Sequence, residues 1–226
     1  MGESQTVPRS QYRMSFVTEF LGTMALVIAG AGSVALTSVA GISEGLVLVA
    51  LVFGATVFSL GATLGRLSSV HINPAVSLAH VLSGRLRPNL LVPRVLFQVL
   101  GAICGGIVLS LFFPSSAASG YLGSTLLAST IPPWTGTILE AAGTFVLSIV
   151  ILTPMRGLGT NTNSMLVGFA LFILIMILGP LTSASLNPAR SIGPAIVSRH
   201  LEDLEVYIIG PLAGGLLAGV IARIRR

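Results

Sequence analysis

Two asparagines stand directly before prolines at matched places in a very apolar chain. Asn73-Pro-Ala and Asn187-Pro-Ala each follow a serine-containing stretch and precede small residues. Asparagine is a good helix N-cap and proline is favoured at the first helical position, so each triplet predicts the start of a helix. One triplet could be no more than a cap. Two at matched places predict a site built from Asn73, Pro74, Ala75, Asn187, Pro188 and Ala189.

The composition indicates that this site lies in a membrane. The 226 residues are 53% hydrophobic and 8% charged, with a mean hydropathy of +0.95, whereas soluble domains carry about 25% charged residues. Apolar runs near the roughly 20 residues that span hydrocarbon as a helix occur at about 14–37, 45–65, 92–113, 135–154, 164–182 and 206–222. Two shorter runs, about 74–83 and 188–198, follow the triplets and are too short to cross.

The charges predict an orientation. The net charge is +5, and all 12 basic residues are arginine. With the N-terminus inside, the outer side keeps Arg190 and Arg199, near Glu44, Glu202, Asp203 and Glu205. The inner side receives Arg9, Arg13, Arg66, Arg85, Arg87, Arg94, Arg156, Arg223, Arg225 and Arg226. This positive-inside bias predicts cytoplasmic termini and argues against a nucleic-acid surface. The polar head leads straight into a full-length span, so no cleavable signal peptide is expected.

The two halves of the chain repeat each other. Glu19 and Glu140 each begin a Glu-x-x-Gly-Thr sequence, and Gln98 parallels Pro211 before a pair of small residues. We predict a single membrane domain over 1–226, with repeat one at about 10–113, repeat two at about 133–226 and a connecting loop at 114–132. Three spans per repeat invert the second copy, so the two short helices would enter from opposite faces and meet near the bilayer centre.

The backbone before each triplet would then line a passage. Irregular backbone at that depth must be buried in protein or face a wet cavity. We expect this lining from Ser69, Val70, His71, Ile72, Ser183, Ser185 and Leu186. The His71 ring could face the passage or pack as a neutral side chain. Helix N-termini and asparagine amides make the centre positive and rich in donors, which suits water and disfavours ions. A water bound to both amides points its hydrogens away and cannot relay a proton.

At these motifs the chain resembles the aquaporin, or major intrinsic protein, family. The resemblance rests on H-x-N-P-A-V from His71, N-P-A-R-S-x-G-P from Asn187 and the two E-x-x-G-T sequences. It implies an all-α membrane protein with six transmembrane helices, two re-entrant half-helices and one pore per subunit of a homotetramer. It also implies that Glu19 and Glu140 are buried supports of the two loops.

The family's outer constriction is assigned by this resemblance to Phe53, Ile175, Ala184 and Arg190. Arg190 is a permanent cation that would repel other cations. Strict water channels of the family usually have histidine where Ile175 falls, and glycerol facilitators usually have aspartate where Ser191 follows the arginine. We therefore expect water conduction with passage of small neutral solutes such as glycerol, ammonia, hydrogen peroxide or hydrogen sulfide. A glycerol-type facilitator is the alternative.

Other classes of protein fit less well. A secondary active transporter needs intramembrane groups that bind and release ions, and only Glu19 and Glu140 qualify. A closed structural membrane protein is disfavoured by the short tails and loops. The chain shows no nucleophile–base pair and no metal-ligand spacing, so neither an enzyme nor a cofactor is expected. The expected partners are water, small neutral solutes and lipid, and the expected location is the inner or plasma membrane. The absence of a glycosylation sequon favours a prokaryotic source.

Overall fold

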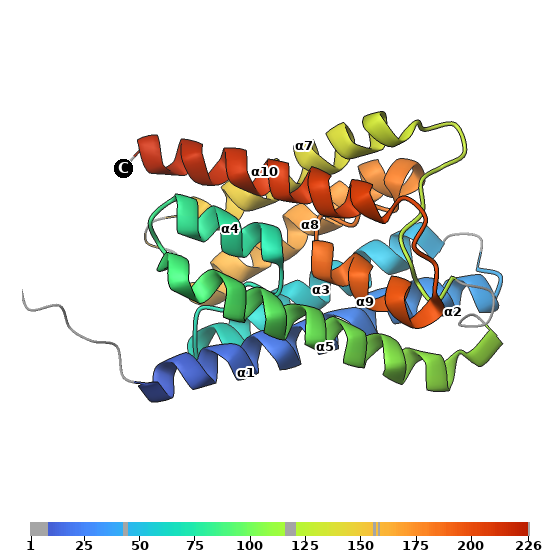
Figure 1. Ribbon diagram of the computed structural model, residues 1–226, viewed down its shortest axis with the longest axis horizontal. Coiled ribbons are helices and arrows are strands. Elements are labelled where there is room, and N and C mark those ends of the chain that lie inside the picture. The colour runs from blue at the N-terminus through green and yellow to red at the C-terminus, as the bar shows by residue number, and fades with distance from the viewer. Residues whose placement is uncertain (1–8, 43–44, 116–120, 156, 158, 226) are drawn as a thin grey trace, which may run out of the picture.

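The computed structural model describes residues 9–42, 45–115, 121–155, 157 and 159–225. Of the charged residues that predict the orientation, Glu44, Arg156 and Arg226 lie outside the described residues, as does the side chain of Arg9. Both ends of the described chain lie at the same end of the helical bundle, at the left of Figure 1. We call that end the termini side and the opposite end the far side.

Within the described residues, six stretches of helix are long and apolar enough to cross a membrane, and there is no strand. The all-α class with six candidate spans is therefore confirmed. The first span is built from α1, the π-helix η1 and α2. The helices of the six spans are α1 (Arg9–Leu26), η1 (Val27–Ala31), α2 (Gly32–Val39), α3 (Gly45–Thr63), α5 (Leu91–Phe112), α7 (Pro133–Leu152), α8 (Thr160–Thr182) and α10 (Leu204–Ile224), with short 3-10 helices η2 (Leu64–Arg66) and η3 (Pro88–Leu90) beside α3 and α5.

Two half-length helices follow the asparagine–proline triplets. Helix α4 covers Pro74–Leu82 and helix α9 covers Pro188–Ser198, within one residue of the expected runs 74–83 and 188–198. Both lie between the long helices in Figure 1, with α4 toward the termini side and α9 toward the far side. Their proline ends lie toward the centre of the bundle.

The last long helix of each half packs against the half-helix of the other half. Helix α5 packs against α1 and against α9, whereas α10 packs against α7 and against α4. Each half-helix is therefore packed against the last span of the opposite half. The remaining spans, α3 and α8, pack against each other.

Small residues allow these contacts to be close. A Cβ added at Gly101 would overlap the carbonyl oxygen of Phe20 on α1, and one at Gly214 would overlap that of Ala141 on α7. At Gly215 the obstacle is the carbonyl of Ala75, at the start of α4. Backbones can approach this closely only where side chains are absent, which is the usual basis of helix packing in lipid.

Candidate functional site

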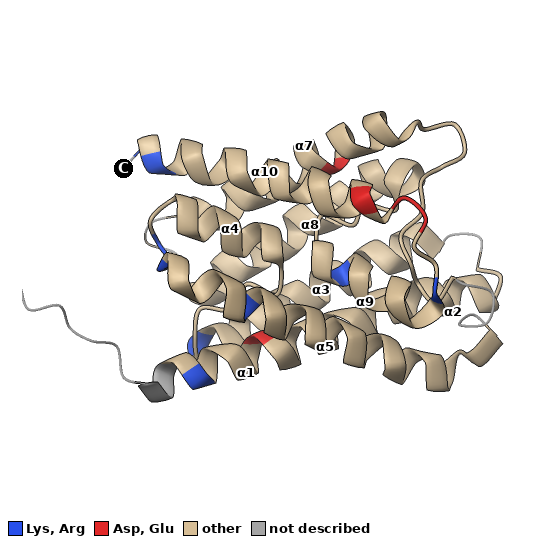
Figure 2. Ribbon diagram, in the orientation of Figure 1, with Lys and Arg blue, Asp and Glu red and all other residues tan. Residues whose placement is uncertain are grey.

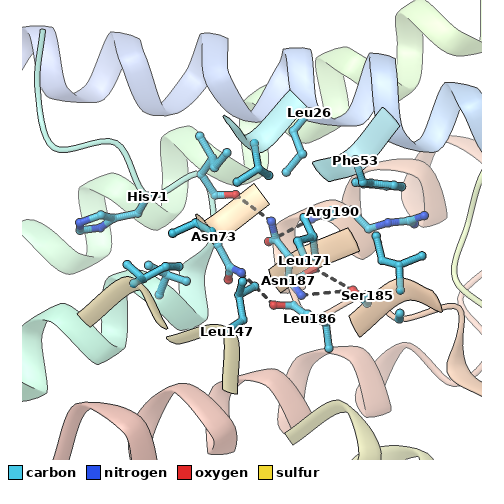
Figure 3. A pocket seen from close by; sticks show the side chains of 17 residues that line it. Leu26, Phe53, His71, Asn73, Leu147, Leu171, Ser185, Leu186, Asn187 and Arg190 are labelled. Carbon is cyan, nitrogen blue, oxygen red and sulfur yellow. Dashed lines mark hydrogen bonds between the residues drawn. The ribbon is translucent and has the colours of Figure 1, made fainter. Parts of the chain in front are cut away.

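The two half-helices meet through their asparagines. The Asn73 amide nitrogen donates to the Leu186 carbonyl at 2.8 Å, and the Asn187 amide nitrogen donates to the Ile72 carbonyl at 2.8 Å. Leu186 directly precedes Asn187, and Ile72 directly precedes Asn73. Each amide therefore binds the loop of the other half (Figure 3). The tips of α4 and α9 are therefore in contact at the centre of the protein.

The same side chains cap their own helices. The Asn73 carboxamide oxygen accepts from the Ala75 backbone N–H at 2.9 Å, and that of Asn187 accepts from Ala189 and Arg190 at 3.1 and 3.3 Å. Both caps have extended backbone and are followed by proline at the first helical position. Because each oxygen is engaged in capping and one N–H binds the opposite loop, the second N–H is the group that each amide has left for a ligand.

Both loops adopt the same unusual backbone conformation before the asparagine. Ile72 has a φ of +50° and Leu186 a φ of +53°. A positive φ is rare outside glycine and is least favourable for a β-branched residue such as isoleucine. This conformation turns each carbonyl toward the opposite asparagine amide, and it must be held by the surroundings.

In the first half, Glu19 holds the loop from α1. Its carboxylate accepts from the backbone N–H of His71 at 2.9 Å and from that of Ile72 at 2.6 Å. The side chain is fully buried. Gly22, one turn further along α1, leaves room for the loop, because a Cβ there would lie 2.7 Å from the Ile72 side chain.

In the second half, Glu140 does the same from α7. Its carboxylate accepts from the backbone N–H groups of Ser185 and Leu186 at 2.9 and 2.7 Å, and from the Thr182 hydroxyl at 2.7 Å. A Cβ at Gly143 would lie 2.6 Å from the Leu186 side chain. The two Glu-x-x-Gly sequences thus pair a carboxylate for the loop N–H groups with a glycine that makes space for the loop side chain.

Arg94 and Gln98 are functional neighbours that the sequence reasoning missed. The charge pattern places Arg94 with the arginines of the inner face, but in the structure it is only 4% exposed. It forms an ion pair with Glu19 at 2.8 Å, and its guanidinium also donates to the carbonyl of Ser69 at 2.8 Å. The Gln98 amide donates to the other Glu19 oxygen at 2.8 Å. The available signal was their four-residue spacing, which places both on one face of α5.

A narrow cavity of about 50 Å³ passes the two tips. At roughly 10–15 Å³ per enclosed water centre, this is room for a few water molecules. In Figure 3 it extends from His71, past Asn73 and Asn187, to Phe53 and Arg190. Much of the remaining wall is apolar, from Leu26, Val57, Val76, Leu147, Ile151, Val167 and Leu171.

The four predicted constriction residues all line this cavity. They are Phe53, Ile175, Ala184 and Arg190. Arg190, 2% exposed, donates from Nη1 to the Gly123 carbonyl at 2.8 Å, and its guanidinium carbon lies 5.1 Å from the centre of the Phe53 ring. Gly123 belongs to the predicted connecting loop, and no sequence signal had marked it as a partner of the arginine.

The predicted lining backbone divides into two groups. His71, Ile72, Ser185 and Leu186 line the cavity, whereas Ser69, Val70 and Ser183 are absent from its lining. The Ser69 carbonyl accepts from Arg94 instead, and the Ser183 hydroxyl exchanges hydrogen bonds with the backbone of Leu126. Val70 packs against the apolar core.

The His71 ring combines the two roles that the sequence allows for it. It lines the cavity and is also packed, since its Nδ1 lies 3.0 Å from the Ser77 hydroxyl and its ring stacks on that of His80 at 4.0 Å. Its Nε2 is buried and has no hydrogen-bond partner. Among the described residues, no group of histidine, cysteine and carboxylate side chains could hold a metal ion.

Comparisons with known proteins agree on one family. The family model "Major intrinsic protein" matches residues 6–222. Aquaporin Z of Rhodopseudomonas palustris is 32% identical over 222 residues, covering 92% of each chain. Aquaporin NIP1-1 of Zea mays is 34% identical over 203 residues, covering 88% of this chain and 70% of that one. Among solved structures, the aquaglyceroporin from Plasmodium falciparum aligns with a TM-score of 0.83 and 23% identity over 94% of each chain. The chain therefore belongs to the major intrinsic protein family.

Proposed function

We propose that the protein is a passive channel for water and small neutral solutes that excludes ions and protons. The observation that carries this proposal is the contact between the two half-helix tips. There, Asn73 and Asn187 bind each other's loops and border a narrow cavity. Family membership supports the same class of function.

Water would be oriented at this contact. Each asparagine has one amide N–H left for a ligand, because its oxygen and its other N–H are already engaged. A water that accepts from both amides directs its two hydrogens toward the two ends of the cavity. A proton cannot then be passed along an unbroken chain of hydrogen bonds. The positive ends of α4 and α9 add an electrostatic barrier to cations.

The solute range would be set near Arg190. Its fixed charge repels cations and can donate to water or to a hydroxylated solute. The side chains of Ile175 and Ala184, which line the same cavity, offer only apolar surface. This apolar surface favours passage of glycerol, ammonia, hydrogen peroxide or hydrogen sulfide besides water. For the same reason, a glycerol-type facilitator is the second candidate function.

The two buried glutamates argue against ion-coupled transport. Glu19 accepts four hydrogen bonds, two from the loop backbone and two from Arg94 and Gln98. Glu140 accepts three, and neither side chain is exposed. Groups held in this way support the loops and are poorly placed to bind and release ions in turn. We assign no catalytic role to the chain.

We further propose a single channel domain over 1–226, with repeats at about 10–113 and 133–226 joined by the loop 114–132. Arginines gather at the termini side in Figure 2, and this supports cytoplasmic termini in a plasma or inner membrane. Apolar side chains such as Val92 and Phe112, each 76% exposed, suit contact with lipid or with other subunits. A homotetramer, as the family implies, is the proposed assembly.

Reconstituted vesicles test the function. Stopped-flow shrinkage should show osmotic water permeability well above that of protein-free vesicles, and a solute gradient should dissipate without accumulation. Accumulation of any solute against its gradient would favour a transporter. Water flux equal to that of empty vesicles would contradict the proposed channel.

A further inference from the structure

The first span contains a wide turn that its counterpart in the second half lacks. The π-helix η1, Val27–Ala31, interrupts the α-helical geometry between α1 and α2. The corresponding span, α7, is a single α-helix over Pro133–Leu152. π-helical turns are rare and are frequently found at functional sites, because one extra residue redirects the side chains and carbonyls around it.

This turn contacts the predicted constriction through a glycine. A Cβ added at Gly30 would overlap the Phe53 ring, reaching 2.6 Å from Cδ1 and lying closer still to Cε1 and Cζ. The ring therefore lies directly against the bare backbone of the π-turn. Phe53 is 5% exposed, and the open space beside it is the cavity that it lines together with Leu26, the residue before the turn.

Ala31, the next residue of the turn, lies against Gly123, which binds Arg190 of the predicted constriction. A Cβ at Gly123 would overlap the Ala31 carbonyl, and Gly123 has a φ of +68°. A side chain there would therefore meet both steric overlap and an unfavourable backbone conformation. The Gly123 carbonyl is the acceptor for Arg190 Nη1. Gly30 therefore lies directly against Phe53, and Ala31 lies directly against Gly123, the acceptor of Arg190.

We propose that Gly30 is a further specificity-determining residue of the channel. The π-turn Val27–Ala31 sets how far the Phe53 ring projects into the passage, and the missing side chain at Gly30 gives the ring its present depth. This inference rests on the proposed function, since it assumes that solutes pass through the cavity that Phe53 and Arg190 both line. A side chain at Gly30 displaces the ring toward the cavity and lowers the size of the largest solute admitted.

Gly30→Ala tests this in reconstituted vesicles with water, ammonia and glycerol as probes. Addition of one methyl group in a tight contact shifts discrimination by about tenfold or more. The reduction in permeability should be larger for larger solutes. Glycerol flux should drop at least about tenfold, while water flux is reduced much less. Gly32→Ala is the matched control on the same span. Its Cβ would meet only the flexible end of Leu109, at 2.9 Å, and the order and ratios of the three permeabilities should stay as in the unaltered protein.

A second variant tests whether the loss of glycerol flux acts through the Phe53 ring. Phe53→Val in the Gly30→Ala background removes the overlap and should restore glycerol flux to the level of the unaltered protein or above. If Gly30→Ala fails to fold, the double variant should fold and conduct. The inference is overturned if Gly30→Ala lowers all three permeabilities by one common factor, leaves their ratios unchanged, or is not rescued by Phe53→Val. If the unaltered protein conducts none of the probes, the proposed function itself is wrong, and this result is separate from the other outcomes.

Discussion

The two halves of the protein hold equivalent loops with different chemistry. In the first half, Glu19 is paired with a buried cation, Arg94, and with the Gln98 amide. In the second half, Glu140 is bound by a hydroxyl from Thr182 and by backbone N–H groups. The residues at the repeat positions of Arg94 and Gln98 are Tyr207 and Pro211, and neither can supply a positive charge.

The arginines of the two halves are also placed differently. Arg94 lies behind its loop, where it binds the Ser69 carbonyl, and it is not part of the cavity wall. Arg190 lies on the cavity wall beside Phe53. A duplicated fold can therefore keep one backbone geometry at its centre while it uses one cation for support and the other for selection.

The largest effect is expected from breaking the buried ion pair. Glu19→Gln leaves Arg94 buried without its counter-charge, and such a loss costs about 3–5 kcal/mol. Glu140→Gln removes a charged acceptor with no buried cation bonded to it, so a smaller loss of about 1–3 kcal/mol is expected. Unfolding in detergent at several temperatures measures both. Arg94→Gln in the Glu19→Gln background should recover part of the first loss. Equal losses at both glutamates would contradict the difference between the halves.

The glycines of the two Glu-x-x-Gly sequences should respond alike. Gly22→Ala and Gly143→Ala place a methyl group at 2.7 and 2.6 Å from Ile72 and Leu186. Overpacking of this kind costs about 1–3 kcal/mol. Both variants should lose stability and water flux, because the displaced residues carry the carbonyls that bind the asparagine amides. Gly65→Ala is a control, since nothing beyond its own stretch of backbone lies within 4 Å of the added Cβ. Strong loss in only one of the two would show that the loops are held differently than the hydrogen bonds indicate.

A smaller and more selective change is expected at Ile175. Ile175→His adds a polar ring to the cavity lining that includes Arg190. Glycerol and ammonia fluxes should fall about tenfold, equivalent to about 1.4 kcal/mol, while water flux is largely kept. Side-by-side permeabilities in vesicles measure this. An unchanged ratio of glycerol to water flux would place the selective region elsewhere.

The smallest effect concerns mercurial reagents. The one cysteine, Cys104, lies on α5 and is not part of the cavity lining, so the unaltered channel should keep its water flux after treatment. Ala184→Cys places a thiol in that lining and should make the flux sensitive to mercury and recoverable with reducing agent. Loss of water flux in the unaltered protein after mercury treatment would mean that Cys104 reaches the passage.

The sequence predicts most of the framework, because strong local signals specify it. Asn73 and Asn187 each combine a cap, a proline and an apolar run, and the half-helices begin where these signals place them. The contacts between distant segments could not be read in this way. The ion pair of Glu19 with Arg94, the acceptor role of Gly123 and the π-turn at Val27–Ala31 depend on tertiary packing. The spacing of Arg94 and Gln98 places both on one face of α5, but it does not identify Glu19 as their partner.

The central claim is that Asn73 and Asn187 orient water and so interrupt proton transfer. Vesicles containing the protein, with a pH-sensitive dye inside, measure osmotic water flux and proton flux in one preparation. We predict rapid water flux with proton flux no greater than that of protein-free vesicles, and a rise in proton flux when Asn73→Asp replaces the amide donor with a carboxylate. Proton flux that rises together with water flux in the unaltered protein would contradict the account.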